Sequence, residues 1–228
     1  MPVNWLNGMK NDFVCIPVQS LTGEMVAIDL SYRPQTHDAA SKILLRPVSA
    51  EDRLLNQLLF VEEYAGYFRQ RGLLCSVAID FQLARAITES PFVQQILTHL
   101  PFIRLKLSED FPNLHDGMDN PLLRALHEQL NILWLDDLGA GDANLHALQS
   151  SLFEAVKLDR QFYLNNVNKP FFSVLISHIR QYTNRVIVEG VNAQAQIAIL
   201  ARSKVWGVQG YFAPSMALSA LDQGNSSG

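Results

Sequence analysis

Short apolar, β-branched runs alternate with longer segments of helical periodicity along most of the chain, and this alternation limits the fold more than any other feature. It is typical of repeated β/α units around a parallel sheet. Eight runs qualify as candidate strands: Cys15–Val18, Val26–Asp29, Cys75–Ile79, Ile103–Leu107, Ile132–Leu135, Ala155–Leu158, Val186–Val188 and Val205–Val208. Eight strands predict a closed (β/α)8 barrel of the α/β class.

Two long amphipathic segments, residues 50–72 and 169–183, lie between candidate strands and are expected to form helices of an outer ring. In the second segment, apolar residues recur at helical spacing: Phe172, Leu175, Ile176 and Ile179. The longest irregular connection, residues 33–50, is a candidate loop over one mouth of the barrel.

The chain has 228 residues, of which 48% are hydrophobic, so it can bury one large core. No internal repeat or Pro/Ser-rich linker divides it. We therefore expect a single domain over residues 1–221, followed by a disordered tail, DQGNSSG, at 222–228.

Charge and hydropathy argue against two classes of partner. The formal net charge is −4 and Lys and Arg form no cluster, which disfavours direct binding of nucleic acid. No apolar run reaches the ~18 residues that a membrane span needs, and the N-terminal segment lacks a secretory signal pattern.

Cys15 and Cys75 lie in apolar runs, where buried reduced thiols are common. We expect a cytoplasmic protein with no membrane contact.

Polar residues gather where the candidate strands end. In a β/α barrel the carboxyl ends of the strands converge on one mouth, where the chemistry takes place. The strand-end residues are Asp29, Ala78 to Asp80, Lys106, Asp136, Asp137, Lys157, Asp159, Glu189 and Gln209. Carboxylates that converge in this way need a cation or a base to neutralise them.

Taken singly, these residues have structural explanations. Asp136 is also suited to a helix N-cap or a turn before the glycine-rich stretch that follows it. Lys157 and Asp159 are equally suited to a solvated strand end. Their joint occurrence on one rim favours an inherited functional site.

The ordered motifs DLSYR (29–33), KLSE (106–109), LDDLGAG (135–141), VKLDRQF (156–162), VIVEGVN (186–192) and VQGYF (208–212) resemble those of EAL domains, the cyclic-di-GMP phosphodiesterases. The resemblance covers nearly the whole chain. It implies an EAL-type, TIM-like barrel, in which active members use two divalent ions to activate a water that cleaves one phosphodiester bond.

Four positions depart from the family pattern. Asp29 replaces the glutamate that names the family, and Ala78 replaces an asparagine ligand; Lys106 and Asn192 each replace a glutamate. The family residue remains at Arg33, Asp136, Asp137, Lys157, Glu189 and Gln209. The vestigial site then comprises Asp29, Ala78, Lys106, Glu109, Asp136, Asp137, Lys157, Glu189, Asn192 and Gln209. We expect it to hold no catalytic residue, no metal and no cofactor.

Lys106 is the decisive departure. Its ammonium would repel Mg²⁺ and could supply the positive charge that Asp136 and Asp137 need, so we expect an internal salt bridge in place of the metal. The alternative is that Lys106 extends out of the barrel mouth into solvent. Only Arg33 and Gln209 remain to contact cyclic-di-GMP, whose binding we expect to be weak or lost.

Within the family, the chain resembles the small stand-alone degenerate EAL proteins of enterobacteria that act as anti-FlhDC factors, including over LPFIRLKLSEDFPNLHDGMDN (100–120). This resemblance implies binding to the FlhD subunit of FlhDC, the master transcription activator of flagellar genes. It further implies blocked DNA binding by FlhDC and repressed motility. Two alternatives remain: a cyclic-di-GMP receptor that does not hydrolyse its ligand, and a weak cyclic-di-GMP phosphodiesterase.

Partner binding requires exposed apolar side chains. Apolar residues cover more of the 50–72 helix than one core-facing stripe needs, which makes five of them candidates: Leu58, Phe60, Val61, Tyr64 and Phe68. Phe171 is a further candidate, because it adjoins Phe172 and both rings cannot face the barrel. The alternative in both places is a helix that buries two of its faces.

Overall fold

The computed structural model describes residues 13–33, 49–141, 146–218 and 220–221, and within these ranges one sheet forms the centre of the molecule. Its strand order is β2-β3-β4-β5-β6-β7-β8-β1-β9, and β1 also pairs with β2, so that β1 to β8 close into a barrel. The bounds are β1 Phe13–Gln19, β2 Met25–Tyr32, β3 Leu74–Ala78, β4 Ile103–Ser108, β5 Leu133–Leu138, β6 Phe153–Leu158, β7 Arg185–Glu189, β8 Gly207–Gln209 and β9 Met216–Ala217. The expected α/β barrel is confirmed.

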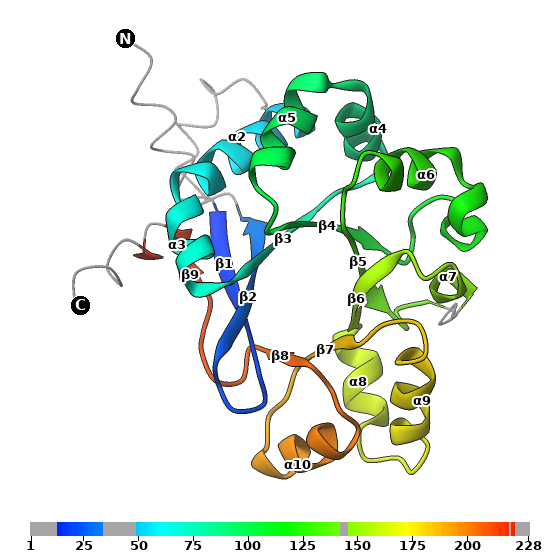
Figure 1. Cartoon of the computed structure of the whole chain (residues 1–228). Coiled ribbons are helices and arrows are strands. Elements are labelled where there is room, and N and C mark those ends of the chain that lie inside the picture. Colours follow the sequence, from blue (N-terminus) through cyan, green and yellow to red (C-terminus); the bar gives the residue numbers. More distant parts are fainter. Residues whose placement is uncertain (1–12, 34–48, 142–145, 219, 222–228) are drawn as a thin grey trace, which may run out of the picture.

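Helices surround the barrel (Figure 1). They are α2 Ala50–Glu63, α3 Ala65–Arg71, α4 Phe81–Glu89, α5 Pro91–His99, the 3-10 helix η2 Leu114–Asp119, α6 Pro121–Glu128, α7 His146–Gln149, α8 Arg160–Asn166, α9 Phe172–Ile179 and α10 Gln194–Arg202. Side-chain caps fix several of their starts: Asp80 accepts a hydrogen bond from the Leu83 amide, and Asp159 from the Phe162 amide. Asp159 is therefore a helix cap and not a solvated strand end.

The first strand runs against the others. β1 pairs antiparallel with β2 and with β8, whereas β2 to β8 pair in parallel. The expected parallel sheet is confirmed for β2 to β8 and is wrong for β1, because the connection from β1 to β2 is a tight turn in which the Ser20 amide donates to the Glu24 carbonyl. Such a short connection permits only antiparallel pairing, since a parallel crossover needs a dozen or more residues.

Alternate residues of each strand point into the barrel, and they form layers along its axis. One inner layer is apolar and consists of Val18, Ala27, Trp134, Ala155 and Ile187. Two residues further along β2, β5, β6 and β7, the inward positions become Asp29, Asp136, Lys157 and Glu189. The strand register thus places the charged groups directly above an apolar floor at the carboxyl ends of the strands.

The expected exposed patch on residues 50–72 is wrong. The segment breaks at Tyr64 into α2 and α3, and its five candidate partner residues are buried: Leu58, Phe60, Val61, Tyr64 and Phe68. The apolar residues pack against two different parts of the core. The centres of the Phe60 and Phe13 rings are 5.6 Å apart, and the Phe68 ring stacks on Phe102 with 4.9 Å between ring centres. Most of the apolar surface of this segment lies in the core, and Leu59 stays 36% exposed.

Several expectations concern residues outside the described ranges. They include most of the connection at 33–50 and the whole tail at 222–228.

Of the described helices, none is long and apolar enough to cross a membrane. The second predicted helix is present as α9, with Phe172, Ile176 and Ile179 buried as its spacing predicts and Phe171 left 48% exposed.

Gly139, the residue after β5, provides a test of how the loop after β5 packs on α8. We expect Gly139→Ala to lower the free energy of unfolding by roughly 2–4 kcal/mol. The reason is that its φ is +97° and an added Cβ would lie 2.5 Å from Cγ of Phe162 in α8. Gly141→Ala is the matched control, because nothing lies within 4 Å of its added Cβ. Urea unfolding of both variants measures the difference, and equal losses would contradict the role of the Phe162 contact.

Candidate functional site

The carboxyl ends of the strands bring six of the predicted site residues together. They are Asp29 from β2, Lys106 from β4, Asp136 from β5, Lys157 from β6, Glu189 from β7 and Gln209 from β8. Ion pairs or hydrogen bonds connect all six. The inward strand positions account for this convergence.

Lys106 lies at the centre of the cluster. Its Nζ is 2.7 Å from Oδ2 of Asp29 and 2.7 Å from Oδ2 of Asp136. The Lys106 side chain is only 8% exposed, so the alternative in which it reaches solvent is wrong. The other oxygen of Asp29 accepts a hydrogen bond from the Ser76 hydroxyl at 3.0 Å, so this buried carboxylate is bonded on both sides.

A second ammonium completes the cluster. Nζ of Lys157 is 3.1 Å from Oε2 of Glu189, 3.5 Å from Oδ1 of Asp136 and 3.8 Å from Oδ2 of Asp29. Two lysines thus face three carboxylates in a region that is largely shielded from water. Attraction between opposite charges is strong in such a place, and so is the cost of leaving any one of them unpaired.

The pKa values follow from this arrangement. Burial alone would raise the pKa of Asp29, but Lys106 and Lys157 outweigh burial and hold it below its ordinary value. Burial would lower the pKa of Lys106, and the Asp29 and Asp136 carboxylates more than reverse this effect and raise it. Both groups are therefore charged near neutral pH.

Asp137 does not have the role that the sequence analysis gave it. The sequence predicts ion pairs of Lys106 with Asp136 and Asp137. In the structure Lys106 pairs with Asp136 and with Asp29. Burial and the neighbouring Asp136 charge raise the pKa of Asp137. The backbone at Asp137 has a φ of +57°, a left-handed conformation that interrupts the alternation of the strand. Asp136 in turn accepts a hydrogen bond from the Asp137 amide, so it also acts as a turn former.

The remaining predicted residues lie around the cluster. Glu109 accepts a hydrogen bond from the Gly139 amide at 2.9 Å and so supports the loop after β5. Ala78 and Arg33 line a hollow of about 450 Å³ at the mouth, together with the charged cluster. Asn192 is exposed, and its backbone N–H donates a hydrogen bond to Oε1 of Gln196.

Sequence reasoning missed two contributors. Ser76 has an inward position in β3 two residues before Ala78, and the alternation of the strand could have identified it. Gln57 of α2 lines the mouth and donates a hydrogen bond to the Leu30 carbonyl. No sequence signal marked Gln57, because it lies within an otherwise apolar helix segment.

These residues do not fit a pair of divalent ions. The Lys106 ammonium occupies the space between the Asp29 and Asp136 carboxylates, and Ala78 offers no oxygen. Mg²⁺ requires several oxygen ligands in near-octahedral arrangement. Throughout the described ranges, no group of three or more His, Cys, Asp and Glu side chains is arranged to hold a metal. The chemistry of the donors at this mouth is that of an internal ion-pair network.

The chain is similar to two curated proteins with different printed functions. Cyclic di-GMP phosphodiesterase PdeH of Escherichia coli K12 is 29% identical over 160 residues, which are 68% of this chain and 61% of PdeH. This match therefore spans less than two thirds of PdeH. The anti-FlhC(2)FlhD(4) factor YdiV of Salmonella paratyphi B is 23% identical over 217 residues, which are 90% of this chain and 91% of YdiV.

Solved structures share the fold. The crystal structure of the EAL-like domain protein YdiV has a TM-score of 0.78 and 23% identity and covers 94% of this chain and 97% of its own. An EAL domain protein of Listeria monocytogenes EGD-e has a TM-score of 0.67 and 19% identity and covers 99% of both chains. The sequence model of the EAL domain matches residues 54–215, which is well over half of the chain. The chain therefore belongs to the EAL domain family.

Proposed function

We propose that this protein is a non-enzymatic EAL-like regulator that binds FlhDC through its FlhD subunit, blocks DNA binding by FlhDC and thereby represses flagellar genes and motility. The observation that carries the proposal is Lys106 between Asp29 and Asp136, in a barrel whose donors do not fit the divalent ions that the family's chemistry requires. The names of the relatives that match it over most of their length supply the partner.

The proposal includes an internal cation in place of a metal. An ammonium on a protein side chain cannot dissociate, polarise a phosphate or lower the pKa of a bound water as a divalent ion does. It neutralises the carboxylates that the fold inherited, and the barrel remains stable. The proposal also includes a cytoplasmic location, in keeping with two buried free thiols, Cys15 and Cys75.

Removal of the Lys106 charge should destabilise the fold. We expect Lys106→Met to lower the free energy of unfolding at pH 7 by roughly 3 kcal/mol, since it leaves the buried Asp29 and Asp136 carboxylates with Lys157 alone. The double variant Asp29→Asn/Lys106→Met should recover part of this loss, because it removes the charge left behind. Urea unfolding of the three proteins measures the effect.

The loss should depend on pH. Lys106 holds the pKa of Asp29 below its ordinary value in the folded protein, so the stabilisation is present above the ordinary aspartate pKa and is lost as the pH falls below it. The gap between wild type and Lys106→Met should therefore shrink below about pH 4. A gap that stays constant from pH 7 to pH 3 would contradict the ion-pair role.

Calorimetry tests the absence of the family's chemistry. We expect no heat on titration with cyclic-di-GMP, with or without Mg²⁺ or Mn²⁺, and no linear product. Lys106→Glu removes the central ammonium and restores a carboxylate, so it should raise the affinity for divalent ions. Binding without turnover would support a receptor instead, and metal-dependent cleavage at a substantial rate would refute the proposal. Unchanged metal affinity in Lys106→Glu would refute the blocking role of the lysine.

Binding to FlhDC tests the partner. The purified protein should co-purify with FlhD and with FlhDC, and a shift of promoter DNA by FlhDC in gel electrophoresis should weaken as the protein is added. Lys106→Glu, checked for its fold, should bind as well as wild type, because the cluster lies at the barrel mouth and acts within the protein. Failure of wild type to bind FlhD or FlhDC would overturn this part of the proposal.

A further inference from the structure

Three helices of this protein end in the same backbone turn. In each turn, a residue with a positive φ donates its N–H to the carbonyl three residues back, and the next N–H bonds the carbonyl five residues back. This pair of bonds defines a Schellman motif, in which glycine is usual at the left-handed position because it has no Cβ. That position holds Gly72 after α3, Lys204 after α10 and Leu130 after α6. Leu130 is the large apolar residue among the three.

Leu130 is unfavourable for the isolated chain in two respects. Its φ of +62° is a left-handed conformation that a side chain with a Cβ rarely adopts. The side chain is also 87% exposed, so it contributes almost no apolar burial to the fold. Lys204 has the same backbone conformation, but its ammonium suits an exposed position. A strained backbone that presents a leucine to solvent points to a contact outside the chain.

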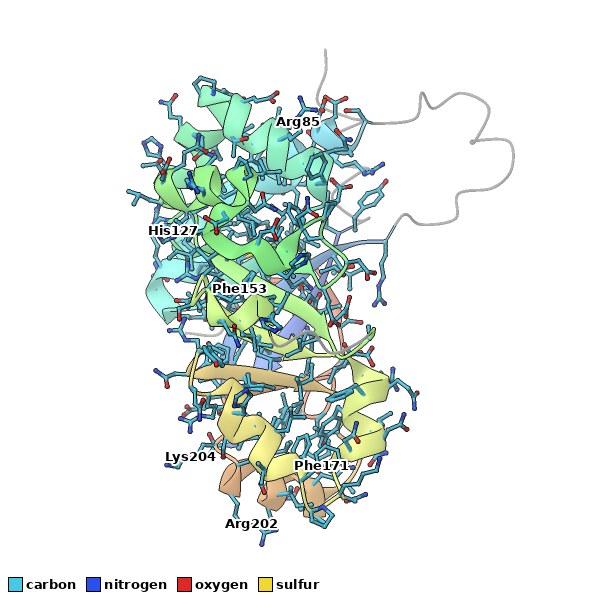
Figure 2. All side chains as sticks on the ribbon, turned by 90° about the vertical axis from the view of Figure 1, so that its right-hand side faces the viewer. Arg85, His127, Phe153, Phe171, Arg202 and Lys204 are labelled. Carbon is cyan, nitrogen blue, oxygen red and sulfur yellow. The ribbon has the colours of Figure 1, made fainter. Side chains whose placement is uncertain are left out.

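A hollow of about 230 Å³ lies beside Leu130, and we call it the α5–α6 hollow. It lies between α5 and the turn after α6, at the amino-terminal ends of β4 and β5, and its floor consists of Leu97, Leu100, Ile103 and Leu105. A cavity of about 150 Å³ accommodates a benzene ring, so this hollow has room for a leucine side chain. His127, three residues before Leu130, lies on the left side of the molecule in Figure 2. The mouth hollow and the α5–α6 hollow share no lining residue.

The polar side chains that line the α5–α6 hollow already have partners within the chain. Nε2 of Gln94 donates to Oε1 of Gln129 at 2.7 Å, and Nε2 of Gln129 donates to the Thr88 carbonyl at 3.0 Å. The Thr98 hydroxyl and Nδ2 of Asn131 also donate to backbone carbonyls. These bonds connect α5 to the end of α6 and fix the walls of the hollow.

The electrostatic character of the α5–α6 hollow limits what can enter it. The described residues that line it carry no charge, whereas charged residues line the hollow at the mouth and the hollow beside α4. A charged or strongly polar group placed here would lose its water and gain no partner. The occupant that matches this hollow is therefore an uncharged, apolar side chain.

The same patch carries such a side chain. Leu130 projects from the rim of the hollow, and Ile132 beside it is 38% exposed. In a two-fold pair of molecules one patch faces an identical patch. Leu130 of each copy then enters the hollow of the other, and both copies bury Ile132. This contact leaves no charge unpaired and is complete with two copies, because the same patch is used on both sides.

We propose that two copies of this chain pair through the turn after α6, with Leu130 of each copy in the α5–α6 hollow of the other. The patch is small, and small interfaces are weak, so we expect a dissociation constant of roughly 10–100 μM. The proposal goes beyond the proposed function and does not depend on it.

Analytical ultracentrifugation of the full chain tests the pairing. Wild type should change from monomer to dimer as its concentration rises through the dissociation constant, and Leu130→Gly should stay monomeric over the same range. Lys204→Gly is the matched control, because it makes the same change in the same backbone turn. Figure 2 shows Lys204 in the lower part of the molecule, away from His127 of α6. Lys204→Gly should dimerise like wild type, and a monomeric wild type would refute the proposal.

Thermal unfolding separates pairing from damage to the fold. At concentrations where wild type is monomeric, Leu130→Gly and Lys204→Gly should each raise the melting temperature by roughly 1–4 °C, because glycine relieves the left-handed backbone. Loss of the dimer in a variant that is at least as stable as wild type then identifies a contact between copies. A lower melting temperature for Leu130→Gly would show that Leu130 packs within its own chain, and would overturn the proposal.

A second variant tests the hollow itself. Thr98→Arg places a charge at its rim and leaves Leu130 unchanged, so it should weaken the dimer roughly tenfold or more. A dimer that persists in both Leu130→Gly and Thr98→Arg uses another surface and refutes the proposal.

Binding of the same proteins to FlhDC separates this proposal from the proposed function. If wild type dimerises through Leu130 but does not bind FlhDC, the proposed function fails and the pairing stands. If wild type is monomeric and both variants lose affinity for FlhDC, the hollow receives FlhDC, and pairing of two copies is refuted.

Discussion

The ammonium of Lys106, held 2.7 Å from each of two buried carboxylates, is the contact on which the mouth of this barrel depends. It connects β4 to β2 and β5, and Lys157 extends the connection to β6 and β7. Without these cations three acidic groups would face one another above an apolar floor, where water screens them only in part. A divalent ion can leave its site, whereas a lysine carried by the chain cannot. The same carboxylates that suit a metal therefore serve here to hold strand ends together.

The sequence predicted the barrel because hydrophobic periodicity is a local signal, and six of the predicted site residues meet because strand ends converge in this fold. Three features escaped prediction for separate physical reasons. The antiparallel direction of β1 follows from a tight turn near Gly23. The number of candidate strands alone does not reveal the direction of each strand. Asp29, not Asp137, meets Lys106 because the left-handed backbone at Asp137 interrupts the strand, and neighbouring residue types do not reveal a dihedral angle. The apolar α2 and α3 are buried in two directions, and periodicity alone cannot show what covers a helix.

The barrel architecture and the charged cluster at its mouth depend on different features of this molecule. Backbone pairing and the layers inside the barrel depend on strand residues, so replacement of the mouth ligands leaves the architecture intact. Glu189 of β7 and Gln209 of β8 belong to the charged cluster, whereas α8, α9 and α10 contribute no residue to it. Residues at the mouth of an EAL barrel can therefore differ from the family pattern while the fold stays the same.

The pairing of β1 with both β2 and β8 also bears on how the ring is completed. Val18 lies opposite Gln209, almost at the other end of the chain. During synthesis β1 and β2 leave the ribosome before β8, and the edge of β1 that pairs with β8 has no neighbour until β8 emerges. Contacts between such distant residues form slowly, and open strand edges attract other chains. Until this pairing forms the barrel is unclosed, and the free edge of β1 can pair with the strand of another chain.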